Sequence, residues 1–327
     1  MNSAHAIRIH EHGDPGVLRW EEIEVPDPGP GEVLVRHTAI GLNFIDTYHR
    51  SGLYPVPSLP AVPGVEAVGR VEKVGPGVDG LAPGDRVAYA VVIGAYATLR
   101  IIPSGRLVRP PESIDDEIVA GYLLKGMTAG MLLRTAGVAA GGSVLVRAAA
   151  GGVGLILSQW ASAAGLRVIG TAGTEAKADL AHRHGCDEVI VSTKESLPGR
   201  IADLTGGRGV AAVFDGVGRS TFEESLEALS LDGFMVSYGN ASGPVAPFEL
   251  LRLSKKNLRL ARPSLVPHVA DGARLRAAAA EAFGMLTGGR VVVTIGRRLR
   301  LRDAAEAHRL LEARATSGAT VLLPATD

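Results

Sequence analysis

The stretch from residue 144 to residue 261 constrains the fold most, because short apolar runs alternate there with segments of helical spacing. Strands are predicted at 144–146, 168–170, 189–191, 211–214, 233–238 and 258–261, and helices at 153–164, 175–184 and 221–229. Strands that alternate with helices in this way form a doubly wound parallel sheet. We therefore predict an α/β domain with such a sheet over residues 124–265.

A glycine-rich turn, Ala149-Ala150-Gly151-Gly152-Val153-Gly154, joins the first predicted strand to the first predicted helix. It has the spacing of the dinucleotide fingerprint, with Ala149 in the first glycine position. Such a turn lets the backbone approach a pyrophosphate, which then sits at the helix N-terminus. Turns of this kind also occur for packing alone. The predicted strand before this glycine-rich turn, and the helix and second strand after it, favour a bound dinucleotide and hence a Rossmann domain.

The end of the second predicted strand indicates which dinucleotide is bound. A carboxylate at this place binds the ribose 2′-hydroxyl of NADH. The chain instead has Thr171-Ala172-Gly173-Thr174, with no acid, and then Lys177. The missing acid and the nearby cation favour a 2′-phosphate, and therefore NADPH over NADH. The alternative is that Lys177 is an ordinary exposed helix lysine.

The N-terminal third has a different rhythm, with closely spaced strands predicted at 33–40, 65–74, 85–90 and 96–102. No regular helices lie between them, so this part is predicted to form a compact β-rich, barrel-like unit. The C-terminal part returns to helices, predicted at 274–286 and 301–315. The simplest organisation is a β-rich substrate domain built from residues 1–123 and 266–327, with the nucleotide domain inserted between its two parts.

Composition excludes several classes of protein. Lys+Arg and Asp+Glu balance at 34 each, so no net charge steers the chain to nucleic acid or to a membrane. The single cysteine, Cys186, excludes a disulfide framework and a four-cysteine zinc lobe. We find neither a signal peptide nor a long apolar run, and expect a cytoplasmic protein. Basic runs at 252–259 and 297–302 raise nucleic-acid binding as an alternative, but without interleaved aromatics they are better explained as solvated charges.

Several motifs together resemble the medium-chain dehydrogenase/reductase superfamily, and more narrowly its zeta-crystallin-type quinone oxidoreductases. The motifs that carry this resemblance run nearly end to end: Asn43-Phe44-Ile45-Asp46, Arg50-Ser51-Gly52-Leu53-Tyr54-Pro55, Pro63-Gly64-Val65-Glu66, Gly84-Asp85-Arg86-Val87, Leu124-Lys125-Gly126-Met127-Thr128, the glycine-rich turn, Ser237-Tyr238-Gly239-Asn240, Arg262-Pro263-Ser264-Leu265 and Glu312-Ala313-Arg314-Ala315-Thr316. The resemblance implies a GroES-like fold for the β-rich domain, an NADPH-dependent reductase of quinones, and a homodimer paired through the last strand of the nucleotide sheet.

The chain departs from the zinc-dependent branch of that superfamily. That branch holds zinc with a cysteine near the position of Leu42 and with the histidine of a Gly-His-Glu triplet. The chain has Gly64-Val65-Glu66 instead, and no cysteine precedes Cys186. Since tetrahedral zinc sites in proteins need thiolate or imidazole ligands, we expect no metal.

Without a metal, hydride transfer should run toward an acceptor that is already electron-poor, such as a quinone or a conjugated enone. Such an acceptor needs a donor for the developing oxyanion, and Tyr54 could supply it. Asn43 and Asp46 could orient the substrate or the nicotinamide ribose. The alternatives are loop packing for Tyr54 and helix capping for Asp46. The resemblance favours a site role for Asn43 and Tyr54, since both coincide with cleft positions of the family.

The resemblance also implies the cofactor contacts. They are Asn43, Thr128, Gly151, Gly152, Val153, Gly154, Lys177, Tyr238, Gly239, Asn240 and Arg314, with Arg314 reaching the 2′-phosphate. Relatives often have a Tyr or His where this chain has Ser192, which bears on how strongly NADPH is preferred. The predicted function is therefore the reduction of quinones. Reduction of 2-alkenals, enones or enoyl thioesters is the alternative within the same chemistry, and a non-catalytic NADPH-binding role is a further alternative.

Overall fold

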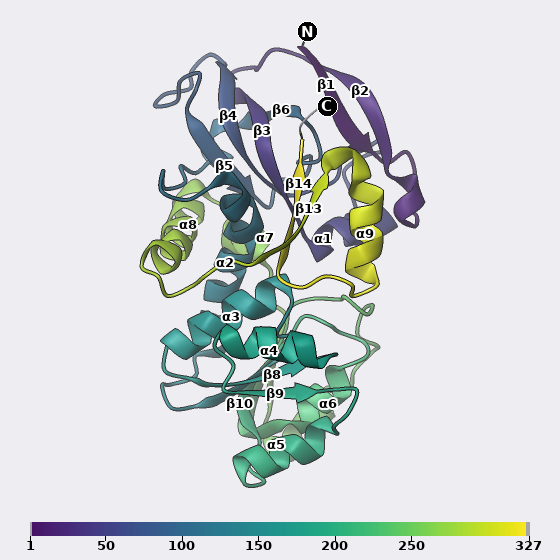
Figure 1. The fold of residues 1–327 in the computed structure, drawn as a ribbon, viewed down its shortest axis with the longest axis vertical. Coiled ribbons are helices and arrows are strands. Elements are labelled where there is room, and N and C mark those ends of the chain that lie inside the picture. Colours follow the sequence, from purple (N-terminus) through teal and green to yellow (C-terminus); the bar gives the residue numbers. More distant parts are fainter. Residues whose placement is uncertain (1, 325–327) are drawn as a thin grey trace. The chain divides into compact units, whose positions relative to one another are not determined.

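The computed structural model describes residues 2–324, and its contacts divide the chain into two compact units. The first unit comprises the residues up to Leu124, Val269–Phe283, and the residues from Val293 on. The second comprises Lys125–His268 and Gly284–Val292. Figure 1 labels the elements of both units. The expected boundaries, 1–123 and 266–327 around 124–265, differ most clearly at Gly284–Val292, which groups with the second unit.

A pair of hydrogen bonds explains the placement of this short segment. The Gln159 side-chain amide donates to the carbonyl of Val292 (3.0 Å) and accepts from its backbone N–H (2.8 Å). A single glutamine thus binds one residue of the segment through both of its polar groups. The local sequence around Val292 does not indicate that Gln159, more than a hundred residues away, is its partner.

The first unit is β-rich, as expected, and its strands pair antiparallel except for the last two, which pair parallel. Its larger sheet has the order β13-β14-β3-β4-β5, with β6 also paired to β3, and β1 and β2 form a separate two-stranded sheet. The bounds are β1 Asn2–Arg8, β2 Arg19–Val25, β3 Glu32–Leu42, β4 Glu66–Val74, β5 Arg86–Ala90, β6 Leu99–Pro103, β13 Ile295–Arg300 and β14 Ala319–Leu323. The core between these strands includes Val35, Ile40, Val71 and Tyr89.

Three helices matter for the first unit. They are α1 (Phe44–Ser51), α8 (Gly272–Thr287) and α9 (Ala304–Glu312), with short 3-10 turns at Pro15–Val17, Ser104–Arg106 and Leu301–Asp303. The predicted helix at 301–315 is thus shorter than expected. Helix α1 directly follows β3, and Asn43 is the one residue between them.

Helix α2, Asp116–Ala136, was not predicted from the sequence. Every residue from 119 to 132 is buried, so the helix has no polar face. A helix that is buried all round shows little 3.6-residue contrast between apolar and polar positions, which is the signal that identifies helices in sequences. The chain of α2 contributes to both units, since Leu124 ends the first and Lys125 begins the second.

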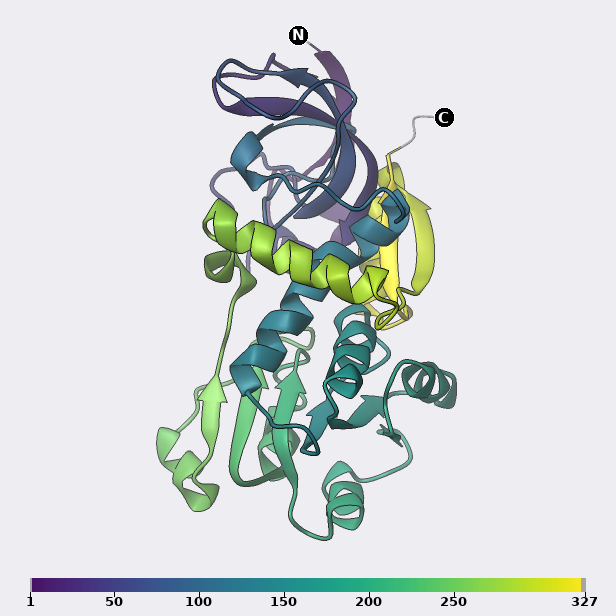
Figure 2. The same cartoon turned by 90° about the vertical axis from the view of Figure 1, so that its left-hand side faces the viewer.

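The second unit contains a six-stranded parallel sheet in the order β12-β11-β10-β7-β8-β9 (Figure 2). In chain order this is 3-2-1-4-5-6 read from β9, the doubly wound order of dinucleotide-binding domains. The bounds are β7 Ser143–Val146, β8 Arg167–Ala172, β9 Glu188–Val191, β10 Val210–Asp215, β11 Leu229–Ser237 and β12 Arg259–Ala261. The predicted doubly wound sheet is therefore confirmed.

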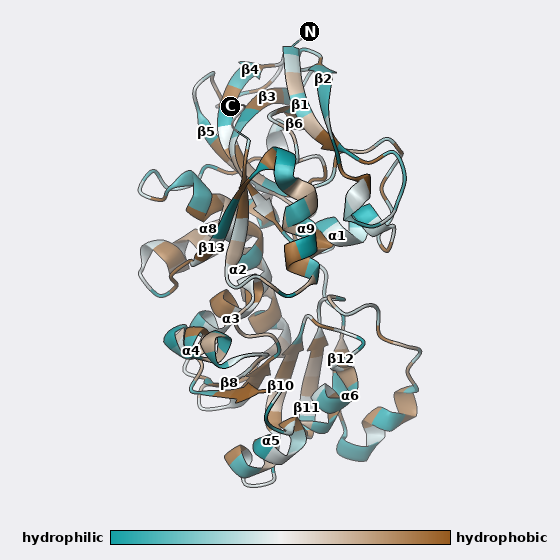
Figure 3. Cartoon of the chain, turned by 45° about the vertical axis from the view of Figure 1, so that its right-hand side comes forward, coloured by the Kyte–Doolittle hydropathy of each residue, from teal (hydrophilic) through white to brown (hydrophobic). Residues whose placement is uncertain are grey.

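Helices pack against this sheet and complete its core. They are α3 Gly152–Ala163, α4 Glu175–Arg183, α5 Leu197–Thr205 and α6 Phe222–Glu227, followed by a 3-10 turn at Leu250–Lys256 and the short α7 Leu265–His268. Figure 3 shows hydrophobic colour along β8, β10 and β11, as expected for parallel strands buried on both faces. Among the residues that the structure describes, no helix is both long enough and apolar enough to cross a membrane.

Candidate active site

Asn43 and Asp46 lie together at the start of helix α1. Asn43 is the N-cap residue, in an extended conformation, and its backbone N–H donates to Asp46 Oδ2 at 2.8 Å. Asp46 is the third residue of the helix and is fully buried. The contact matches the helix-capping alternative for Asp46. Asp46 therefore fixes the backbone of Asn43 at the point where β3 gives way to α1.

The side chain of Asn43 is bound by Glu66, the first residue of β4. Asn43 Nδ2 donates to Glu66 Oε2 (2.9 Å) and to the carbonyl of Gly41 (3.4 Å). Glu66 Oε1 in turn accepts from the backbone N–H of Leu124 in α2 (2.6 Å). Asn43 is 6% exposed and Glu66 is fully buried. Sequence reasoning named Glu66 only as part of a family motif and missed this contact.

Tyr54 follows the C-terminal end of α1, which closes at Gly52 in the left-handed conformation. Its backbone N–H donates to the carbonyl of Tyr48 (3.1 Å), so the chain turns back along the helix. The ring packs edge-on against Tyr48, with 5.1 Å between centroids, and is half-buried. The packing expected under the alternative for Tyr54 is therefore present, and it also fixes the direction of the ring.

A buried chain of polar side chains connects α1 to α9. Arg50 Nη1 donates to His308 Nδ1 (3.1 Å), and Tyr96 Oη lies 3.0 Å from both His308 Nε2 and Asp46 Oδ2. The Tyr96 hydroxyl has one hydrogen and gives it to Asp46, so it accepts from His308 Nε2–H. Arg50 is 3% exposed and also forms a bidentate ion pair with Glu312. All donors in this chain point toward the Asp46 carboxylate.

Two pKa shifts follow from this burial. Burial, together with the adjacent Arg50 guanidinium, which disfavours the imidazolium, lowers the pKa of His308 to about 3. Burial also raises the pKa of Tyr96 well above its usual value, and Asp46 raises it further. Both groups are therefore neutral at physiological pH, and each takes part in the chain by accepting one hydrogen bond and donating the next.

Arg314 lies just beyond the end of α9, two residues after Glu312. It is exposed, and its φ of 56° places it in the left-handed conformation that ends many helices. Its N–H donates to the carbonyl of Leu311 (3.1 Å). Arg314 belongs to the first unit, and its contact with a cofactor stays a prediction.

The glycine-rich turn has the geometry of a phosphate-binding loop. Gly151 is the N-cap of α3, and Ala148 before it has a φ of 53°. A Cβ on Gly154 would lie 2.4 Å from the carbonyl oxygen of Ala148, so only glycine fits. The first N–H groups of α3 thus open at the carboxyl end of β7, where a dinucleotide phosphate would find unpaired donors and a favourable helix dipole.

Lys177 lies in the first turn of α4, directly after β8. Its backbone N–H donates to the hydroxyl of Thr174, the N-cap residue of α4. Ser192 closes the next loop by donating its hydroxyl to the carbonyl of Ala172 (3.2 Å). Glu175, in the same first turn of α4, is paired with Lys194. The helix that follows β8 therefore carries Lys177 in its first turn, where Glu175 is already paired with Lys194.

The loop Tyr238-Gly239-Asn240 follows β11 and lies against the loop after β10. The Tyr238 N–H donates to the carbonyl of Asp215 (2.8 Å), and a Cβ on Gly239 would lie 2.2 Å from the carbonyl oxygen of Gly216. The Asp215 carboxylate is buried and accepts hydrogen bonds from Val217 N, Gly218 N, Thr221 Oγ1 and Ser225 Oγ. Sequence reasoning missed Asp215, which holds this pair of loops in place.

The candidate cofactor residues of the second unit therefore share one edge of the sheet. Gly151–Gly154 follow β7, Lys177 follows β8, and Tyr238–Asn240 follow β11, and parallel strands place their carboxyl ends together. Thr128 is buried within α2. In the first unit, Asn43 and Asp46 meet at the start of α1, whereas Tyr54 follows its other end and packs on Tyr48. Among residues 2–324, no three His, Cys, Asp or Glu side chains converge as a metal site.

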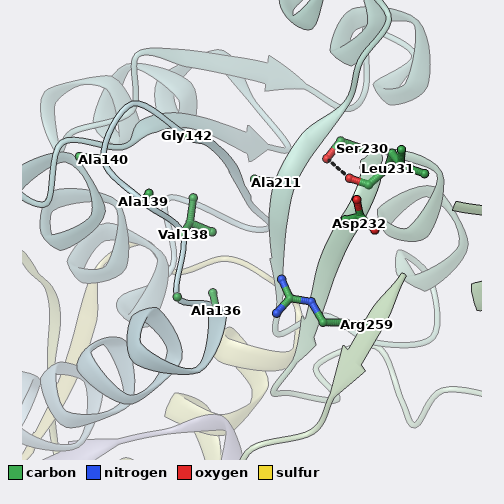
Figure 4. A pocket seen from close by; sticks show the side chains of 11 residues that line it. Ala136, Val138, Ala139, Ala140, Gly142, Ala211, Ser230, Leu231, Asp232 and Arg259 are labelled. Carbon is green, nitrogen blue, oxygen red and sulfur yellow. Dashed lines mark hydrogen bonds between the residues drawn. The ribbon is translucent and has the colours of Figure 1, made fainter. Parts of the chain in front are cut away.

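A cavity of about 310 Å³ lies at the opposite, amino edge of this sheet (Figure 4). It is lined mostly by small residues before β7 and at the starts of β10 and β11, with Arg259 of β12 beside it. None of the candidate site residues lines it. Ligands of doubly wound sheets bind at the carboxyl edge, so we do not place the active site in this cavity.

Two family models match the chain. Residues 29–112 match the alcohol dehydrogenase GroES-like domain, and residues 152–281 match the zinc-binding dehydrogenase domain. A quinone oxidoreductase of Pseudomonas aeruginosa is 45% identical over 98% of this chain and 100% of its own length. A 2-haloacrylate reductase of a Burkholderia species is 39% identical over 98% of both chains.

Solved structures agree with these sequence relatives. The crystal structure of the Escherichia coli quinone oxidoreductase complexed with NADPH superposes with a TM-score of 0.94, at 43% identity, covering 98% of this chain and 100% of that one. The mycobacterial protein Rv1454c complexed with NADPH also gives a TM-score of 0.94, at 46% identity over the same shares. The chain thus belongs to the quinone oxidoreductase family of the medium-chain dehydrogenases/reductases, the family that its motifs indicated.

Proposed function

We propose that the protein reduces quinones by hydride transfer from NADPH. The observation that carries the proposal is the full-length similarity to a quinone oxidoreductase solved with NADPH, at a TM-score of 0.94. The features described above support it: a phosphate-binding turn, a lysine after β8, the pair Asn43 and Asp46 at the start of α1, and Tyr54 after its end. The division into a substrate domain (1–123 and 266–327) and a dinucleotide-binding domain (124–265) belongs to this proposal.

The residues present fit NADPH. The donors at the N-terminus of α3 would hold the pyrophosphate, because Gly154 leaves the turn open where a Cβ would collide with Ala148. Lys177 and Arg314 would pair with the 2′-phosphate, the guanidinium in a bidentate manner. Asn43, Thr128 and the loop 238–240 would position the nicotinamide half. When bound, NADPH supplies the hydride that the acceptor receives.

The role of the protein is then to hold the acceptor and stabilise its developing charge. As hydride arrives at a quinone, negative charge builds up on the carbonyl oxygen, and a preorganised donor lowers the barrier. Tyr54 is proposed as this donor, with its ring fixed against Tyr48. Asp46 is fully buried and bound to Asn43 and Tyr96. We therefore assign it the positioning of Asn43 instead of direct contact with the acceptor.

A second candidate function is reduction of a conjugated carbon–carbon double bond. The observation that favours it is the 39% identity over 98% of both chains with a 2-haloacrylate reductase. A quinone and an activated alkene accept hydride in the same way, by conjugate addition that leaves charge on oxygen. The same Tyr54 donor would serve both.

We further propose a homodimer paired through β12, the last strand of the parallel sheet. This edge strand has only three residues; Leu231 in the adjacent strand β11 is 70% exposed, and Leu250 and Leu251 shortly before β12 are 73% and 81% exposed. Pairing with a two-fold mate would cover this edge. A cytoplasmic location without membrane or nucleic-acid partners stays a prediction. Against nucleic acid, Arg252 and Arg298 of the basic runs pair with Glu223 and Glu117.

Steady-state NADPH oxidation with a panel of quinones, enones and enoyl thioesters tests the proposal. We expect the highest kcat/KM with quinones, and a rate that survives exhaustive chelation. Turnover of alkenes but of no quinone would move the assignment to the second candidate. No turnover of any acceptor, with tight NADPH binding, would leave only a non-catalytic role. An electrophoretic shift at physiological salt would point instead to nucleic acid.

A further inference from the structure

We propose that Arg147 is a buried charge that strengthens dinucleotide binding at the carboxyl edge of the parallel sheet, and that Glu224 opposes it. The affinity for a dinucleotide then follows the summed charge of three side chains, Arg147, Asp215 and Glu224, around the ends of β7 and β10. The inference rests on the proposed function and deepens it, because it gives a role to an arginine that the phosphate-binding turn does not use.

Arg147 is bound much less completely than Arg50 and Arg86, which are also buried. Its Nη2 donates to Glu224 Oε2 (3.1 Å), but among residues 2–324 its buried Nε and Nη1 have no acceptor. Arg50 and Arg86, both in the first unit, donate from Nε and from both terminal nitrogens. Burying a guanidinium that has a single acceptor costs free energy. Stability therefore does not account for Arg147.

Arg147 lies where doubly wound sheets bind their ligands. It directly follows β7, and its N–H donates to the carbonyl of Phe214 in β10 (3.0 Å), so the two strands are still paired at this point. Asp215 is the last residue of β10. The strand order reverses between β7 and β10, which makes their carboxyl ends the topological switch point. The glycine-rich turn begins two residues after Arg147.

The side chains of Arg147 and Asp215 both point toward helix α6. Arg147 binds Glu224, and Asp215 accepts from the hydroxyl of Ser225, the next residue of that helix (2.8 Å). The groups that donate to Asp215 are two N–H groups and two hydroxyls, all of them neutral, so they satisfy the carboxylate without cancelling its charge. The three side chains together therefore have one negative charge in excess.

This charge bears on the phosphates of a dinucleotide, which are negative. Arg147 and Asp215 are buried, so solvent screens their charges less than it screens charges at the surface. Arg147 offsets Asp215, whereas the half-exposed Glu224 adds a negative charge and takes one of the Arg147 donors. The turn at Gly151–Gly154 thus offers hydrogen-bond donors, and Arg147 makes the charge around them less repulsive to phosphate.

Substitutions that change the charge in steps test the proposal. Arg147→Met removes the positive charge with a side chain of similar length, and Glu224→Gln removes a negative charge. The double variant Arg147→Met/Glu224→Gln has the same summed charge as the wild type. The matched control is Arg167→Met, because Arg167 is the first residue of β8 and lies at the opposite, amino edge of the same sheet.

The readout is the dissociation constant of NADPH and of NADH for the wild type and the four variants. We expect Arg147→Met to bind both about 3- to 10-fold more weakly, and Glu224→Gln to bind both about 2- to 5-fold more tightly, since a half-exposed charge acts less strongly. The double variant should bind more tightly than Arg147→Met, and Arg167→Met should bind like the wild type. Thermal midpoints without dinucleotide show that each variant is folded.

A merely structural ion pair predicts a different result. If the pair only fixed α6 to the end of β7, Arg147→Met and Glu224→Gln would both weaken binding, because each breaks the same contact. That result, or a double variant no better than Arg147→Met, would overturn the proposal. A loss confined to NADPH would overturn it too, since NADH has the same pyrophosphate and lacks only the 2′-phosphate.

The proposed function can fail separately. A wild type that binds NADPH but reduces no quinone would overturn quinone reduction. Tighter dinucleotide binding by Glu224→Gln and weaker binding by Arg147→Met would still support the role of the buried charge. Equal dissociation constants in all five proteins would overturn that role while NADPH-dependent quinone reduction stands.

Discussion

Mild acid is expected to destabilise the first unit through two buried histidines, His37 and His308. Burial, together with nearby Arg100 for His37 and Arg50 for His308, lowers the pKa of each to about 3. In the unfolded chain both would titrate near ~6.5. Below that pH the unfolded state binds protons that the folded state refuses. The stabilising effect is therefore complete above about pH 6.5 and is lost as the pH falls toward 3.

The magnitude follows from the size of the shift. At about pH 5 each histidine lies roughly 1.5 pH units below its unfolded pKa, which costs ~2 kcal/mol per histidine at ~1.4 kcal/mol per unit. The two together cost ~4 kcal/mol, a large part of the ~5–15 kcal/mol that a folded domain has. Burial lowers the pKa of His49 as well, so its contribution has the same sign. Most carboxylates titrate below this window.

The assay can report on the first unit alone. The chain has two tryptophans, Trp20 in β2 and Trp160 in α3. In a Trp160→Phe background, Trp20 fluorescence follows urea unfolding of the first unit at pH values from about 7 to 5. His308→Gln and His37→Gln should lower the stability at neutral pH yet each remove ~2 kcal/mol of the acid-dependent loss.

The exposed His10 provides the matched control. His10→Gln removes an imidazole from the surface and therefore controls for the loss of a histidine as such. Stability curves for the buried-site variants that run parallel to the wild-type curve would refute the reasoning. They would mean that these imidazoles are already protonated in the folded protein, or that the chain from Arg50 to Asp46 opens before they titrate.

Three further predictions concern the cofactor, the acceptor and the assembly. Arg314→Ala should weaken the binding of NADPH by about 10- to 100-fold and that of NADH much less, and Lys177→Ala should act in the same direction. Equal losses of affinity for both dinucleotides in a titration would contradict pairing with the 2′-phosphate. Tyr54→Phe should lower kcat by as much as about 10²–10³-fold where this donor dominates, and by more with enones than with quinones. The NADPH dissociation constant should stay the same. Unchanged rates on both acceptors would remove Tyr54 from the mechanism. Light scattering at micromolar concentration should report a dimer, which Leu251→Glu should weaken; a wild-type monomer would contradict pairing through β12.

Much of the second unit could be predicted from the sequence. The alternation of strands and helices, and the turn at Gly151–Gly154, are local patterns that repeat within a few residues, and the parallel sheet with α3 at its carboxyl edge has that form. Helix α2 was missed because residues 119–132 are all buried and no polar face marks its period. The grouping of segment 284–292 with the second unit could not be predicted, because Gln159 binds Val292 across 133 residues.

The sequence by itself determined the fold class, the phosphate-binding turn and the missing carboxylate after β8, since each depends on residues close together in the chain. Only the tertiary structure decided what surrounds Asn43 and Asp46. Glu66 reaches Asn43 across 23 residues, His308 reaches Tyr96 across 212, and Arg50 reaches His308 across 258. A donor in a sequence does not specify its acceptor at such separations. The fold supplies it, because a buried polar group must be satisfied by whichever partner packing brings within reach.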